Sequence, residues 1–213
     1  MPTRAFSTLV TELAPSVPGC PEATMIQYIR RAAIDACRRT LMWRYDAPTI
    51  TLVAGTTDYS FSPPLDTVVC AVLSALMNNA PIKTPMLEDA IAQYPQWTTQ
   101  DGEPRLLCQV SLDRFVPLPT PDAQKPYVVR MIYALEPTPT AAGMDEVVLN
   151  ELDVAIVHKA LQDLLVLPKV FWEDRDLAAY HARQYMARLA EKRAKANLGT
   201  FRAAVSVQMR PFA

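Results

Sequence analysis

The alternation of apolar and polar positions predicts helices at both ends of the chain. From residue 22 to residue 41, apolar residues recur every three or four positions, and the charged residues lie largely opposite them. A second apolar stripe runs from about 145 to 167, and Asp174 can cap a last helix that ends near Leu198. The three stripes consist of Met25, Ile26, Ile29, Ala33, Ala36, Cys37 and Leu41, then Leu149, Leu152, Ile156, Ala160, Leu164 and Leu167, then Ala178, Ala182, Tyr185 and Leu189.

Between these segments the pattern changes, and short alternating or β-branched runs predict strands. Residues 49–53 and 59–61 flank a turn-like stretch and are expected to form a hairpin. Residues 67–77 fit either a strand or a buried helix, and their β-branched valines favour the strand. Further strands are predicted at 105–110, 114–119 and 127–134, and short helices at 6–14 and 84–94.

Together these elements predict an α+β fold that is mainly α. Residues 1–45 and 144–199 are expected to form a helical bundle in which the apolar stripes cover each other. Residues 46–143 are expected to form a small Pro-rich β insertion, because most of the 19 prolines fall there and only 5 glycines occur in the chain. Residues 200–213 would be a C-terminal extension.

Charge is distributed unevenly although the whole chain has a formal net charge of only -1. Residues 1–45 carry a net charge of +3, residues 46–174 carry -10 and residues 175–213 carry +6. Basic ends around an acidic middle fit electrostatic complementarity between copies or partners, and they fit equally a solvated surface with chance clustering. No apolar run approaches the ~20 residues that cross a bilayer, so a soluble, intracellular protein without a membrane partner is expected.

The residues that usually carry chemistry are sparse. His158 and His181 are too few for a typical catalytic or metal-binding group, and no glycine-rich phosphate loop or nucleophile motif occurs. The four cysteines fit small buried residues of a reducing compartment better than a disulfide framework. We therefore assign no catalytic residue, metal or cofactor and disfavour an enzyme, unless a deep pocket brings either histidine together with carboxylates.

The last predicted helix carries a basic set that could face DNA phosphates or a partner protein. The alternative is a solvated face, because no helix-turn-helix signature or base-reading aromatic set accompanies the charges. The candidates are Arg183, Arg188, Lys192, Arg193 and Lys195.

Short features in a fixed order cover nearly the whole chain and together resemble one family. Individually none is specific, but their order and spacing are. They are Val17-Pro-Gly-Cys-Pro21, Trp43, Gly55-x-x-x-Tyr59, Gly102-x-Pro104, Val116-Pro-Leu-Pro119, Leu135-Glu-Pro137, His158-Lys-Ala-Leu161, Leu167-Pro168, Phe171-Trp-Glu-Asp174, Ala194-Lys195, Gly199 and Phe212-Ala213. The chain thereby resembles the bacteriophage head-to-tail adaptor (connector) proteins.

This resemblance implies a non-enzymatic virion protein at the head–tail junction, assembled in the host cytoplasm. Its copies would form a ring, typically a dodecamer, below the portal protein and around the DNA channel. Its partners would be the portal, sister subunits, a downstream tail or nozzle protein and, non-specifically, packaged DNA. The C-terminal segment would dock on the portal through its apolar residues. The candidate anchors are Phe201, Val205, Val207, Met209 and Phe212.

Two other classes of protein stay open at this point. The first is another phage neck or tail component, a head-closure or tail-terminator protein, which would rest on a β barrel or sandwich. The second is a small helical DNA-binding regulator, which would bind free duplex tightly and in a salt-dependent manner.

Overall fold

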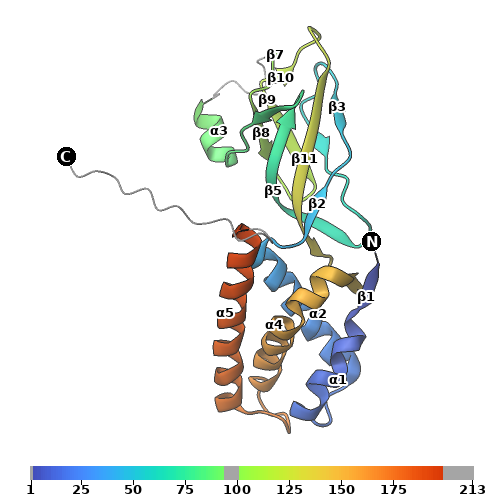
Figure 1. The fold of residues 1–213 in the computed structure, drawn as a ribbon, viewed down its shortest axis with the longest axis vertical. Coiled ribbons are helices and arrows are strands. Elements are labelled where there is room, and N and C mark those ends of the chain that lie inside the picture. Colours follow the sequence, from blue (N-terminus) through green and yellow to red (C-terminus); the bar gives the residue numbers. More distant parts are fainter. Residues whose placement is uncertain (1, 94–100, 199–213) are drawn as a thin grey trace, which may run out of the picture.

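The long helices and the main sheet of this protein occupy opposite ends of an elongated molecule (Figure 1). The structure is a computed structural model, and it describes residues 2–93 and 101–198. We call the lower part of Figure 1 the helical end and the upper part the sheet end.

Three long helices form the helical end, and each begins where the sequence provides a start signal. They are α2 (Glu22–Thr40), α4 (Glu146–Leu165) and α5 (Arg175–Leu198), and α2 packs on both of the others. Asp145 caps α4, because one carboxylate oxygen accepts the backbone N–H groups of Val147 and Val148 at 3.1 and 3.2 Å. Leu41 ends α2 in the left-handed conformation, with φ of 52°. The three predicted long helices are thus confirmed.

The segment before α2 folds into short helical turns that cover α2 and α4. They are η1 (Phe6–Leu9), α1 (Val10–Leu13) and η2 (Ala14–Ser16). The helix predicted over residues 6–14 is thus made of three short turns, and the last of them includes Pro15. Phe6, Leu9 and Leu13 are fully buried, so this segment contributes its apolar side chains to the core rather than lying on the surface.

Two long antiparallel strands, β5 (Thr67–Met77) and β11 (Tyr127–Pro137), dominate the sheet end. The strand order of the main sheet is β2 (Arg44–Asp46), β11, β5 and β6 (Ala80–Ile82), and β3 (Ile50–Leu52) pairs with β11 beyond β2. Along β11, buried and exposed residues alternate from Tyr127 to Ile132, and every residue from Tyr133 onward is buried. That second half of β11 contacts α2, so the strand loses its solvent face where the two ends of the molecule meet.

Smaller sheets complete the structure. A three-stranded sheet lies beside the main sheet, and a pair of parallel strands lies next to the three-stranded sheet. A further antiparallel pair joins the N-terminal segment to the start of α4. Their strands are β4 (Tyr59–Ser60), β9 (Arg114–Leu118) and β8 (Leu106–Gln109), then β10 (Thr120–Pro121) with β7 (Asp101–Gly102), then β1 (Thr3–Ala5) with β12 (Gly143–Asp145). One short helix, α3 (Leu87–Gln93), covers part of β8.

The expected fold class, a mainly α helical bundle with a small β insertion, is wrong. The chain is 42% helical and 28% strand, and several multi-stranded antiparallel sheets make up a β-rich domain. The prediction gave more weight to the long apolar stripes of the helices than to the strands. Prolines interrupt these strands, so their alternation of apolar and polar residues is weak. The proposed division at residues 1–45 with 144–199, 46–143 and 200–213 stays a prediction.

The expected hairpin of residues 49–53 and 59–61 is also wrong, because these strands belong to different sheets. β3 pairs with β11, whereas β4 pairs with β9. A turn does lie between them: Gly55 has φ of 75°, and the Tyr59 hydroxyl bridges the backbone N–H and carbonyl of Val53 at 2.7 and 3.0 Å.

Candidate interaction surfaces

The five basic residues predicted to form one face of α5 point in different directions. Lys192 and Lys195 turn inward to α4, where their Nζ atoms lie 3.1 and 2.8 Å from the Glu151 carboxylate. Hydrogen bonds from Lys195 and Lys192 lower the pKa of Glu151. These two lysines therefore hold α5 against α4, and Glu151 offsets one of their two positive charges.

The other three candidates lie on the exposed side of α5. Arg188 forms a 3.4 Å ion pair with Glu191 on the same helix. Within the described ranges, neither Arg183 nor Arg193 lies in ion-pair distance of a carboxylate. They belong to what we call the outer stripe of α5, a row of exposed residues at helical spacing. The outer stripe consists of Ala179, Arg183, Met186, Ala190 and Arg193.

Apolar residues consequently lie on two sides of α5. The inward side buries Ala178, Tyr185 and Leu189, while Met186 on the outer stripe is 55% exposed. The Tyr185 hydroxyl donates to Asp35 of α2 at 2.6 Å, which fixes the rotation of α5 about its axis. The outer stripe is thus held outward, in a position to contact another molecule.

The two histidines lie next to each other between α4 and α5. Nδ1 of His158 and Nδ1 of His181 are 2.8 Å apart, so one ring donates a hydrogen bond that the other accepts. Burial lowers both pKa values, and the adjacent His181 and Arg188 lower that of His158 further. The Tyr180 ring packs edge-on against both imidazoles. This pair forms a helix–helix contact with no carboxylate among its hydrogen-bond partners in the described part of the chain.

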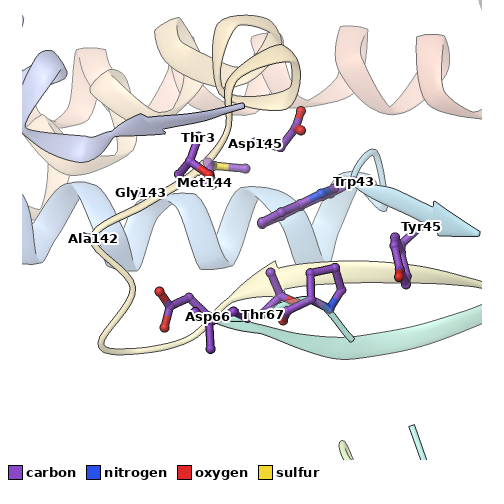
Figure 2. A pocket seen from close by; sticks show the side chains of 11 residues that line it. Thr3, Trp43, Tyr45, Asp66, Thr67, Ala142, Gly143, Met144 and Asp145 are labelled. Carbon is purple, nitrogen blue, oxygen red and sulfur yellow. The ribbon is translucent and has the colours of Figure 1, made fainter. Parts of the chain in front are cut away.

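A cavity of about 490 Å³ opens where the helical end meets the sheet end (Figure 2). Figure 2 shows Thr3, Met144 and Trp43 on one side of it, and Asp66 and Thr67 on the other. Its wall at β12 is backbone held very close to β1, since a Cβ on Gly143 would lie 2.3 Å from the carbonyl oxygen of Arg4.

Trp43 is part of the cavity wall, but its indole N–H is buried within the protein and is not accessible to solvent. The carbonyl of Trp43 accepts a 2.8 Å hydrogen bond from the Leu135 N–H, and its side chain is only 5% exposed. Its indole N–H has no hydrogen-bond partner among residues 2–93 and 101–198. The sequence analysis used Trp43 only as one feature of the family resemblance. It gave no sign of the cavity, whose lining comes from four separate segments.

Several of the predicted features cannot be located. The tail candidates Phe201, Val205, Val207, Met209 and Phe212 lie outside the described residues.

The four cysteines are described, and all are free thiols. No group of three or more potential metal ligands occurs within the described ranges. None of the helices described here is both long enough and apolar enough to cross a membrane.

An elongated chain with an outward apolar helix face and an open cavity fits the class of proteins that act by contacting other proteins. The family model of the SU10 adaptor protein matches residues 4–210, and the chain therefore belongs to that family. None of the curated proteins matches it. Membership makes this chain a structural adaptor of a bacteriophage, a virion component that contacts other capsid or tail proteins. The resemblance expected from the sequence is confirmed.

Proposed function

We propose that copies of this chain form a ring below the portal protein at the head–tail junction and bridge the portal to a downstream tail or nozzle protein. The observation that carries this proposal is the outer stripe of α5, together with the family match over residues 4–210. A 24-residue helix with one buried and one exposed apolar side is suited to packing between two neighbours. The elongated shape separates a helical end from a sheet end, which gives such a ring two chemically different rims.

Charge favours one arrangement of neighbouring copies. α5 and α1 lie on opposite flanks of the helical end (Figure 1), so side-by-side copies bring the outer stripe against the α1 flank of the next copy. The α1 flank carries exposed Glu12, and exposed Glu22 lies at the nearby start of α2. These carboxylates complement Arg183, which lies in the first half of α5, and a head-to-tail contact of this kind closes into a ring.

DNA contact is a weaker part of the proposal. Because Glu151 pairs with Lys192 and Lys195, one of their two positive charges is offset, and fewer of the five basic residues are free to meet phosphates than the sequence suggested. Contact with packaged DNA in the channel would therefore be non-specific and weak. The same balance of charge disfavours a DNA-binding regulator.

The portal would be contacted by the C-terminal segment 200–213 through Phe201, Val205, Val207, Met209 and Phe212. To test this, purified full-length protein is mixed with preformed portal rings and the mixture is separated by size. We expect the protein to co-elute with the portal, and a chain that ends after Gly199 to elute alone. Failure of the full-length protein to co-elute would contradict the proposed function, and co-elution of the truncated chain would contradict the role of the tail.

A further inference from the structure

The cavity beside Trp43 offers a ligand a lining that is largely apolar. Trp43, Pro64, Leu65 and Met144 contribute to that lining. A bound peptide would supply an apolar side chain to fill the cavity, which removes apolar surface from water on both partners.

The mouth of the cavity adds two requirements to that ligand. Leu65 is 92% exposed at the mouth and presents an apolar side chain to solvent. Asp66 beside it is exposed, and no ion pair of Asp66 is found in the ranges that the structure describes. The ligand should therefore carry an apolar group next to a cation.

The C-terminal segment of this chain has that composition. Residues 199–213 contain Arg202 and Arg210, no acidic side chain, and five of the larger apolar residues. Phe201 and Arg202 form an adjacent aromatic and cationic pair only three and four residues after the last residue of α5. Three extended residues span about 10 Å, so the pair can act close to the end of that helix.

The arrangement of the molecule indicates which copy supplies the segment. The Arg44 guanidinium donates to the carbonyl of Ala196 at 2.6 Å, which fixes the end of α5 at the height of β2. Trp43 and Tyr45, on either side of Arg44, line the cavity at that same height. However, β1, whose Thr3 also lines the cavity, lies on the flank opposite α5 (Figure 1). Side-by-side copies therefore bring the α5 end of one copy toward the cavity flank of the next.

We propose that this cavity binds the start of the C-terminal segment of a neighbouring copy, with the Phe201 ring inside the cavity and the Arg202 guanidinium against Asp66. This inference rests on the ring of the proposed function and adds a second link between its subunits. Phe201 is then held by the neighbouring copy, and Val205, Val207, Met209 and Phe212 stay available for the portal.

The test places a photo-cross-linking amino acid, p-benzoylphenylalanine, at position 201 of the full-length protein. Isotopically light and heavy copies are mixed, assembled on portal rings and irradiated, and the cross-linked peptides are identified by mass spectrometry. We expect cross-links from position 201 of one copy to the cavity residues of another copy. The matched control carries the same group at Phe171, a 90% exposed residue in the loop between α4 and α5, and should give no cross-link to the cavity.

A charge substitution at the mouth adds an independent readout. Leu65→Arg should lower the cross-link yield about tenfold, because it removes an apolar contact and places a like charge beside Arg202. The control Met86→Arg changes an equally apolar, 79% exposed residue elsewhere and should leave the yield unchanged.

The possible results separate this inference from the function on which it rests. A ring on the portal without cross-links between copies, or with cross-links only inside one copy, overturns the inference and leaves the adaptor ring standing. Absence of any ring on the portal overturns the proposed function and this inference together.

Discussion

Arg38 and Glu136 form a two-point ion pair where α2 meets β11. Arg38 Nε donates to one carboxylate oxygen of Glu136 at 2.5 Å, and Nη2 donates to the other at 2.6 Å. The Glu136 side chain is 2% exposed, whereas the Arg38 side chain is 57% exposed. The pair therefore joins the helical end to the sheet end through a buried carboxylate that depends on one partly solvated cation.

Arg38→Ala should destabilise the protein by about 2–4 kcal/mol, because it leaves the Glu136 carboxylate buried without its partner. The free energy of unfolding, measured in denaturant, checks this. Arg39→Ala is the control, since Arg39 pairs with Asp35 at a more exposed site and should cost below about 1 kcal/mol. Equal losses for the two variants would contradict the structural role of Glu136.

The histidine pair predicts a dependence of stability on pH. The folded-state pKa values of His158 and His181 lie below the ordinary value of 6.5, chiefly because of burial. The unfolded chain therefore takes up protons first, and the stabilising contact is complete above about pH 6.5 and is lost as the pH falls below it. Unfolding free energies between pH 7.5 and pH 5 should decline less steeply in His158→Gln than in the original protein.

The control for this experiment is Tyr180→Phe, which keeps the ring packed against both histidines and removes only a hydroxyl. It should reproduce the pH dependence of the unaltered chain. If His158→Gln showed the same slope as the unaltered chain, the imidazole pair would have no part in the loss of stability at acidic pH.

Reversing a charge on the outer stripe of α5 should impair assembly without affecting folding. Arg183→Glu places a carboxylate opposite the proposed Glu12 of the next copy, and we expect at least a tenfold loss of adaptor bound per portal at limiting concentration. Glu12→Arg in the same chain should restore binding. The control is Arg105→Glu, which reverses an exposed charge at the sheet end. Full binding by Arg183→Glu would remove the outer stripe from the interface.

Releasing the inward lysines of α5 should increase DNA binding. Glu151→Gln frees Lys192 and Lys195, so the affinity for short duplex DNA should rise, and its salt dependence should steepen by roughly one to two units in log–log slope. Fluorescence anisotropy of labelled duplex over a salt series measures both. Asp163→Asn frees Lys159, outside the predicted basic face, and should have a smaller effect. Unchanged binding by Glu151→Gln would show that these lysines do not reach DNA.

Local sequence signals predicted the helices well, because their evidence lies within a few turns. The apolar spacing from Met25 to Cys37 and the capping role of Asp174 both depend on neighbouring residues alone. Strand pairing was harder to predict. Thr51 pairs with Val128 and Tyr59 with Phe115, and no local pattern specifies partners that lie more than fifty residues away.

The candidate surfaces show the same limit. The sequence identified five basic residues on one helix, but it could not reveal that Glu151 of α4 takes up Lys192 and Lys195, because that depends on how α5 is rotated against α4. The cavity beside Trp43 was missed for a similar reason. Its walls come from Thr3, Trp43, Asp66 and Met144, which only the folded chain brings together.

The most direct measurement of the central claim is electron cryomicroscopy of the full-length protein mixed with its portal ring. The proposed function predicts a second ring of density below the portal, with α5 of each copy against the α1 flank of the next and the sheet ends along one rim. A portal with no added ring, or a ring in which α5 faces solvent on both sides, would contradict it.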